Sequence, residues 1–227
     1  MNSRARPACG ASLAVAPRAA RPAVLAPAPP EPALHHEEVS RITSAVPLIE
    51  ADQAPLLARP FYAGTAPPSP ITASLAHVPE VLEVTLPFIG RVLDPSSIDE
   101  RTKEIVIVRV SALLECRYCV QTHTAIALDS GLGRDEVLAL RGEAPLDAAF
   151  PDAHERALIA WSDAVARGTG AVEPSVGDAF REHFDDPEVV ELTLLAGATM
   201  MLNRYCSALA LPTGEAALAR LANEGIE

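Results

Sequence analysis

The 227-residue sequence contains few aromatic residues, few basic residues and few cysteines. Aromatic side chains make up 4% of it, and 18 basic residues face 30 acidic ones, which gives a formal net charge of −12. Non-specific binding to nucleic acids or anionic membranes requires basic patches, so this acidic balance argues against both kinds of partner. Four cysteines are too few in a chain of this length for a disulfide-stabilised scaffold.

Long apolar runs are also missing. The longest nearly uncharged apolar stretch near the C-terminus, residues 192–202, is well short of the roughly 20 residues that cross a bilayer. A chain of this size can bury roughly 70% of its unfolded surface, so it does not need a metal or a disulfide to fold. We therefore expect a globular, cytoplasmic protein without a cofactor.

Proline is scarce in the second part of the chain, with sixteen of the 21 prolines before residue 96. Residues 1–38 are rich in Ala, Pro and Arg and show neither a helical nor a strand period. Such a segment cannot bury enough apolar surface to offset its ordering entropy, so we expect a disordered tail. Its Arg-rich, acid-free start leaves a targeting segment as the alternative.

Residues 39–95 alternate short apolar pieces with prolines. Each proline disfavours a helical conformation in the residue before it. We therefore expect a broken helical lead-in, with short helices near 50–58 and 72–93. Pro79 and Pro87 are expected to kink or split the second of these.

Residues 96–227 are predicted to form an all-α domain of about six helices. Ser97 and Glu100 match a capping box at a helix start. The apolar residues 104–114 fit either a short buried strand or a buried helix, and the capping box and the length favour the helix. Apolar residues at helical spacing, with Pro at starts and Gly at ends, predict further helices over 117–130, 134–140, 151–167, 174–184, 187–208 and a short segment after Pro212.

The most informative motif is C-x-x-C-x₃-H, formed by Cys116, Cys119 and His123. Residues three and four apart share one face of a helix, so these side chains form one stripe. A helix N-terminus carries partial positive charge and favours a thiolate, and a neighbouring imidazole can take up a proton. If one thiol is oxidised to a sulfenic acid, the second is close enough to form a disulfide. The spacing therefore predicts a dithiol redox centre at a helix N-terminus.

Other uses of a cysteine pair fit less well. Structural zinc normally takes four Cys or His ligands, whereas Cys9 and Cys206 stand alone in the sequence. Covalent haem needs a His directly after the second cysteine, where this chain has Val120. A thioredoxin motif follows a strand, and the surroundings here are helical. Burial of the pair as ordinary core residues stays an alternative, weakened by the polar residues around it.

The motif resembles the E-x₁₁-C-x-x-C-x₃-H signature of AhpD-like alkylhydroperoxidases, within the carboxymuconolactone decarboxylase family. The likeness covers about residues 98–145 and is carried by Glu104, Cys116, Tyr118, Cys119 and His123. AhpD proper has a His between the two cysteines, where this chain has Tyr118. That departure bears on the proton relay and on partnership with a peroxiredoxin or lipoylated donors.

The resemblance implies an all-helical fold that assembles as a homo-trimer or hexamer. It also implies that Cys119 is the peroxide-reactive cysteine and Cys116 the resolving one, with Glu104 and His123 as a proton relay. Along one straight helix, the 12 residues from Glu104 to Cys116 would span about 18 Å. Glu104 can therefore serve the motif only if the chain breaks between them and folds back, and Glu115 is the expected break. The alternative for Glu104 is a solvated acid in the first turn of its own helix.

Three functions follow from this reading. The first is a thiol-dependent peroxidase that reduces hydrogen peroxide or alkyl hydroperoxides and is re-reduced by a dithiol donor. The alternatives are a carboxymuconolactone decarboxylase-like lyase, which does not depend on a cysteine pair, and a non-enzymatic redox sensor. Cys206 is interpreted as an inert packing residue on a late helix. Asn203 and Arg204 also look familial, and we expect them to bond helix ends or a neighbouring subunit rather than to act in catalysis.

Overall fold

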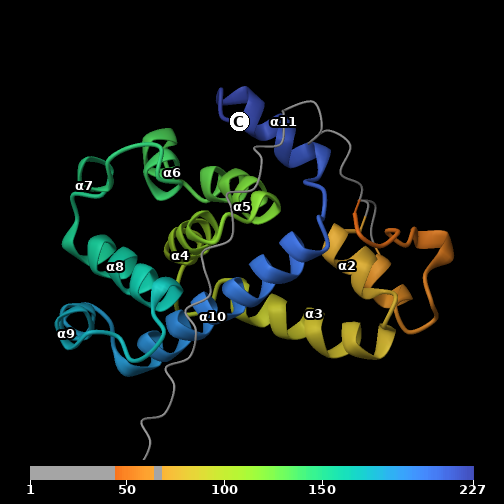
Figure 1. Cartoon of the computed structure of the whole chain (residues 1–227), viewed down its shortest axis with the longest axis horizontal. Helices are drawn as coiled ribbons and strands as arrows, with labels where there is room; N and C mark the ends of the chain where they lie inside the picture. The colour runs from red at the N-terminus through yellow and green to blue at the C-terminus, as the bar shows by residue number, and fades with distance from the viewer. Residues whose placement is uncertain (1–43, 64–67) are drawn as a thin grey trace, which may run out of the picture. The chain divides into compact units, whose positions relative to one another are not determined.

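The computed structural model describes residues 44–63 and 68–227, and within these ranges the secondary structure is helical throughout (Figure 1). This confirms the all-α prediction. The predicted tail, residues 1–38, lies outside the described residues, and the predicted domain boundary near residue 95 stays a prediction. The elements are η1 (Ala51–Gln53), η2 (Arg59–Tyr62), α2 (Pro70–Leu75), α3 (Pro79–Leu93), α4 (Glu100–Leu113), α5 (Arg117–Asp129), α6 (Arg134–Leu140), α7 (Leu146–Ala149), α8 (Ala153–Arg167), α9 (Pro174–Arg181), α10 (Asp186–Ala208) and α11 (Glu215–Asn223).

The described residues form ten α-helices, more than the predicted six or so. The four-residue α7 was missed because so short a helix has no detectable period. The helix expected near 50–58 is wrong: that range contains only the short 3₁₀ helix η1, Pro55 follows it, and the second 3₁₀ helix, η2, begins at Arg59. Pro79 splits the segment 72–93 as predicted, whereas Pro87 is accommodated inside α3.

Helix α4 is the centre of the core. Every residue from Lys103 to Ser111 is buried, and α4 packs against α5, α8 and α10 (Figure 1). A helix that is apolar on nearly every side can be stable only in such surroundings. The predicted capping box at Ser97 is wrong. Asp99 caps the helix instead, since its Oδ1 accepts a hydrogen bond of 2.8 Å from the backbone N–H of Thr102.

Lys103 is the chain's single lysine and is fully buried in the first turns of α4. Its Nζ donates hydrogen bonds of 2.9 and 2.6 Å to the carbonyl oxygens of Val92 and Asp94, at the end of α3. It also forms an ion pair of 2.7 Å with Glu191 on α10. A buried ammonium is tolerated when its hydrogen bonds are satisfied. Lys103 therefore joins the start of α4, and with it Glu104, to α3 and α10.

The chain breaks between α4 and α5 as the sequence predicted. Glu115 has a backbone φ of 55°, in the left-handed region that non-glycine residues rarely adopt. The following residue, Cys116, is the N-cap of α5. The break turns α5 back along α4, so the two helices pack side by side (Figure 1). Glu104 on the first helix can therefore reach the motif on the second.

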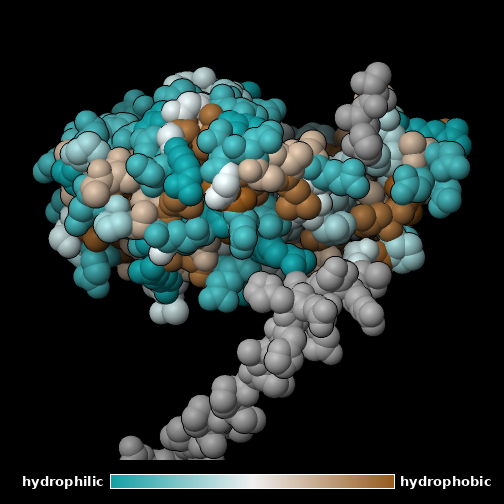
Figure 2. Space-filling view, turned by 90° about the horizontal axis from the view of Figure 1, so that it is seen from above, coloured by the Kyte–Doolittle hydropathy of each residue, from teal (hydrophilic) through white to brown (hydrophobic). Residues whose placement is uncertain are grey.

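Within the described ranges, no helix is both long enough and apolar enough to cross a membrane. Apolar side chains do reach the surface. Figure 2 shows hydrophobic surface in the part of the molecule formed by α2 and α3, among more polar surroundings. Exposed apolar residues form one series on α3 and another on α10, each at helical spacing: Val81, Val84 and Phe88, and Val190, Leu194 and Met201.

Candidate active site

The two cysteines of the motif lie together at the N-terminus of α5. Their Sγ atoms are 2.6 Å apart, and both residues are buried as free thiols. The Sγ of Cys116 also accepts a hydrogen bond of 3.4 Å from the backbone N–H of Cys119, because Cys116 caps the helix. The predicted placement of the pair at a helix N-terminus is therefore what the structure has.

The two thiols differ in acidity. The hydrogen bond from the Cys119 thiol lowers the pKa of Cys116 far below its ordinary value, and the backbone hydrogen bond from Cys119 lowers it further. The pKa of Cys119 is raised by the same interaction and by burial. The hydrogen bond between the two thiols therefore favours the thiolate at Cys116 and the protonated thiol at Cys119. Cys119 needs a base in order to react as a thiolate.

Glu104 and His123 supply a base beside this thiol. The His123 Nδ1 lies 3.1 Å from each carboxylate oxygen of Glu104, and Glu104 is buried. An ionised carboxylate only accepts hydrogen bonds, so Nδ1 carries the hydrogen and Nε2 is the basic nitrogen of the neutral ring. The structure thus brings together all four predicted residues and rules out a solvated Glu104.

Cys119 and His123 line the same cavity, which has a volume of about 60 Å³. This is enough for a few water molecules or a small polar group. Cys116 is not among its lining residues. Aliphatic side chains from four helices, α2, α3, α4 and α10, form the apolar part of its wall: Ile71, Ile89, Leu93, Ile107 and Leu202.

Two buried polar side chains from α10 also face this cavity, Thr199 and Asn203. The Asn203 Nδ2 donates a 3.0 Å hydrogen bond to the Ser111 hydroxyl, while its Oδ1 and the Thr199 Oγ1 have no partner within the protein. Asn203 and Cys119 line the same cavity, and Asn203 opposes the rise in the pKa of the Cys119 thiol. The sequence interpretation of Asn203, as a residue that bonds a helix end or a neighbouring subunit, did not include this cavity. An amide within an apolar helix was the available signal.

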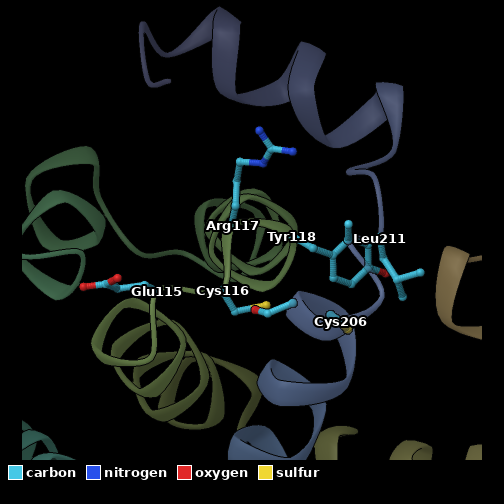
Figure 3. A pocket seen from close by; sticks show the side chains of 8 residues that line it. Glu115, Cys116, Arg117, Tyr118, Cys206 and Leu211 are labelled. Carbon is cyan, nitrogen blue, oxygen red and sulfur yellow. The ribbon is translucent and has the colours of Figure 1, made fainter. Parts of the chain in front are cut away.

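A second cavity, of about 210 Å³, lies next to the cysteine pair. Cys116 and Cys206 both line it, and Cys119 does not. Figure 3 shows Cys206 on α10 close to Cys116, whereas the Arg117 side chain points away from both. Tyr118 lines both cavities and is buried, which raises its pKa.

Cys206 belongs to one buried apolar cluster with Cys116, Tyr118 and Cys119. Its thiol interacts with both thiols of the pair, and the hydrogen bond with Cys116 raises the pKa of Cys206 strongly. Packing explains its burial but not its contact with both reactive thiols. Among the described residues, no group of three or more His, Cys, Asp or Glu side chains is arranged to hold a metal ion.

Part of this chain is similar to a known family. Residues 79–163 match the model of the carboxymuconolactone decarboxylase family, and this range contains all four predicted site residues. The family segment begins with α3 and ends within α8. Of the elements that form the candidate site, it therefore includes α3, α4 and α5, and α10 lies outside it.

One curated protein and several solved structures are also similar to this chain. The uncharacterized protein YdfG of Bacillus subtilis is 27% identical over 115 residues, which are 50% of this chain and 77% of YdfG. The AhpD-core, peroxidase-related protein of Ralstonia eutropha has a similar structure, with a TM-score of 0.68 at 18% identity, covering 77% of this chain and 94% of that one. The debrominase Bmp8 has a TM-score of 0.63 at 19% identity, covering 77% and 95%. At these identities the similarity shows only a common AhpD-like fold. The activities in the names of these proteins are not transferred to this chain.

Proposed function

We propose that this protein is a thiol-dependent peroxidase that reduces hydrogen peroxide or alkyl hydroperoxides through Cys116 and Cys119. The observation that supports this most is the shared cavity of Cys119 and His123, with Glu104 behind the imidazole. A nucleophile, a base and a group that orients the base are the parts that nucleophilic catalysis requires. The neighbouring Cys116 adds a second thiol at 2.6 Å.

The first step is the attack of Cys119 on the peroxide. His123 Nε2 takes the proton of the Cys119 thiol, and Glu104 stabilises the imidazolium that forms. The thiolate sulfur bonds to the terminal oxygen of the hydroperoxide, and the O–O bond breaks. The leaving alkoxide takes the proton from His123 and departs as an alcohol, or as water when the substrate is hydrogen peroxide. Cys119 is left as a sulfenic acid, oxidised by two electrons.

The second step forms the disulfide. Cys116 is the thiol of the pair whose pKa is lowered, and as a thiolate it attacks the sulfenic sulfur of Cys119. The S–O bond breaks, and hydroxide leaves and takes a proton to become water. A dithiol donor then reduces the Cys116–Cys119 disulfide by thiol–disulfide exchange. A lipoyl group or a peroxiredoxin-type partner is the proposed class of donor.

The cavity beside Cys119 fits a hydroperoxide of modest size. Its wall is mainly apolar and suits an alkyl group. The unpartnered Oδ1 of Asn203 and the Thr199 hydroxyl are available to hydrogen-bond the O–OH group. These features favour small alkyl hydroperoxides alongside hydrogen peroxide.

The test is a steady-state assay of the purified protein with hydrogen peroxide, tert-butyl hydroperoxide and cumene hydroperoxide, each with dithiothreitol or dihydrolipoamide as donor. We expect consumption of peroxide that depends on the dithiol. A lactone acid tests the lyase alternative, and 2,3,4-tribromopyrrole, found bound to a variant of Bmp8, tests reductive debromination. If every donor leaves the peroxides intact, the proposal is contradicted. Consumption of the lactone acid or of the tribromopyrrole would replace the peroxidase activity with a lyase or a debrominase activity.

We also propose that the protein assembles as a homo-trimer or hexamer through the exposed apolar residues of α3 and α10. Val84 is 67% exposed and Val190 is 68% exposed, although both are apolar. A second copy of the chain would bury these side chains, at about 25 cal/mol per Å² of apolar surface removed from water.

Val84→Glu is therefore expected to shift the protein from oligomer to monomer, because the interface would bury an unpaired charge. Light scattering coupled to size-exclusion chromatography measures the mass. Leu218→Glu is the matched control, since Leu218 is 42% exposed on α11, away from both helices, and it should leave the mass unchanged. A monomeric wild-type protein would contradict this assembly.

A further inference from the structure

The third buried thiol, Cys206, has no part in the two-step cycle proposed above. It is 1% exposed and comes from α10, outside the segment that carries the motif. Its thiol interacts with the thiols of both Cys116 and Cys119. Cys206 shares one buried cluster with both of them, and a thiol beside a disulfide can exchange with it without an added reagent.

The two cavities distinguish the two disulfides that Cys116 could form. Cys119 and His123 line the small cavity, and Cys206 lines the larger, second one. Cys116 lies between them: its Sγ is 2.6 Å from that of Cys119, and it shares the larger cavity with Cys206 (Figure 3). A disulfide from Cys116 to Cys119 therefore lies toward the peroxide side, and one from Cys116 to Cys206 lies toward the larger cavity.

We propose that Cys206 is a third redox-active thiol. After peroxide reduction it replaces Cys119 as the disulfide partner of Cys116, and the reductant in the larger cavity then reduces the Cys116–Cys206 disulfide. This inference rests on the proposed dithiol cycle and identifies the side on which that cycle is reduced. The two substrates would then use different cavities, and Cys119 would be free again before the reductant arrives.

The exchange balances without an outside oxidant. The Cys206 thiolate attacks the Sγ of Cys116, the Cys116–Cys119 bond breaks, and a Cys116–Cys206 bond forms. Cys119 leaves as a thiolate and takes up the proton that Cys206 has lost. One disulfide is broken and one is made, so there is no net oxidation or reduction. The external dithiol later supplies the two electrons.

Oxidation of the pair also makes Cys206 a better nucleophile. In the reduced protein, its interactions with Cys116 and Cys119 raise its pKa and hold it as a thiol. Once those two sulfurs are joined in a disulfide, neither carries a negative charge, and only burial still disfavours the Cys206 thiolate. Cys206 is therefore an unreactive thiol in the reduced protein and becomes a nucleophile once the Cys116–Cys119 disulfide has formed.

The test uses the full chain in a Cys9→Ser background, which leaves the three clustered cysteines, and oxidises it with diamide. In the Cys119→Ser variant, we expect diamide to consume both remaining thiols and peptide mapping to find a Cys116–Cys206 crosslink. Replacing Cys206 by Ser as well removes the partner and should leave Cys116 reduced. Circular dichroism before oxidation verifies that each variant is folded.

The proposal is overturned if Cys119→Ser keeps both thiols under conditions that oxidise the parent. A second measurement applies if a variant fails to fold. The parent protein is oxidised and quenched with acid, and its disulfides are identified by peptide mapping. The Cys116–Cys206 linkage should be present beside Cys116–Cys119, and its absence contradicts the exchange. Because diamide replaces the peroxide, the outcome is separate from that of the peroxidase assay. Peroxide turnover with no Cys116–Cys206 linkage would overturn this inference alone.

Discussion

Cys119→Ser is expected to lower peroxide consumption by about 1,000-fold or more, because it removes the nucleophile that forms the S–O bond. A hydroxyl in its place is a far poorer nucleophile than a thiolate at neutral pH. Cys116 remains in the variant but does not line the cavity that contains His123. The measurement is the initial rate with tert-butyl hydroperoxide and dihydrolipoamide.

The comparison with Cys116→Ser shows which cysteine attacks the peroxide and which one resolves the sulfenic acid. Removal of the resolving thiol should leave one stoichiometric reaction with peroxide and stop turnover, with a sulfenic acid on Cys119 that dimedone traps. Cys9→Ser is the control for the loss of a thiol outside the clustered set. If Cys119→Ser keeps turnover while Cys116→Ser loses the first reaction, the two cysteines have exchanged roles and the assignment made here is wrong.

Glu104→Gln is expected to lower the rate of the first oxidation by about 100- to 1,000-fold at neutral pH, within the range for a lost general acid–base group. The amide no longer stabilises the imidazolium of His123, which is 3.1 Å from the carboxylate. Because the pKa of Cys119 is raised, its thiol stays protonated at neutral pH without that assistance. Raising the pH ionises the thiol directly, so the variant should recover rate toward alkaline pH more steeply than the wild type. Stopped-flow rates across a pH series measure this.

Glu100→Gln is the matched control, since the same change is made at an exposed residue in the first turn of the same helix. It should leave the rate and its pH profile unchanged. A Glu104→Gln variant with a reduced rate but an unchanged pH profile would mean that Glu104 only supports the structure around His123.

The sequence was sufficient for the local part of the site. The spacing of Cys116, Cys119 and His123 determines one helix face, and the 12-residue separation of Glu104 required a break that the structure has at Glu115. Both inferences depend on helix geometry alone. The turn that follows α5 was likewise predicted by Gly131, which has a positive φ of 94°.

The contribution of α10 could not be predicted in the same way. Cys206 and Asn203 lie at least 80 residues from the motif in the chain, and only the packing of α10 against α4 and α5 brings them to it. Their apolar neighbours indicated burial but not a location. The missed cap at Asp99 has a different origin: Ser97 and Asp99 both suit a helix N-cap, and propensity does not choose between them.

A single-turnover experiment tests the central claim most directly. Reduced wild-type protein is freed of donor and mixed with one equivalent of tert-butyl hydroperoxide, and the alcohol, the remaining thiols and the disulfides are measured. The proposed mechanism predicts one tert-butanol per chain, the loss of two thiols and a disulfide that includes Cys116. Intact hydroperoxide with all thiols retained, or loss of hydroperoxide without any disulfide at Cys116, would contradict it.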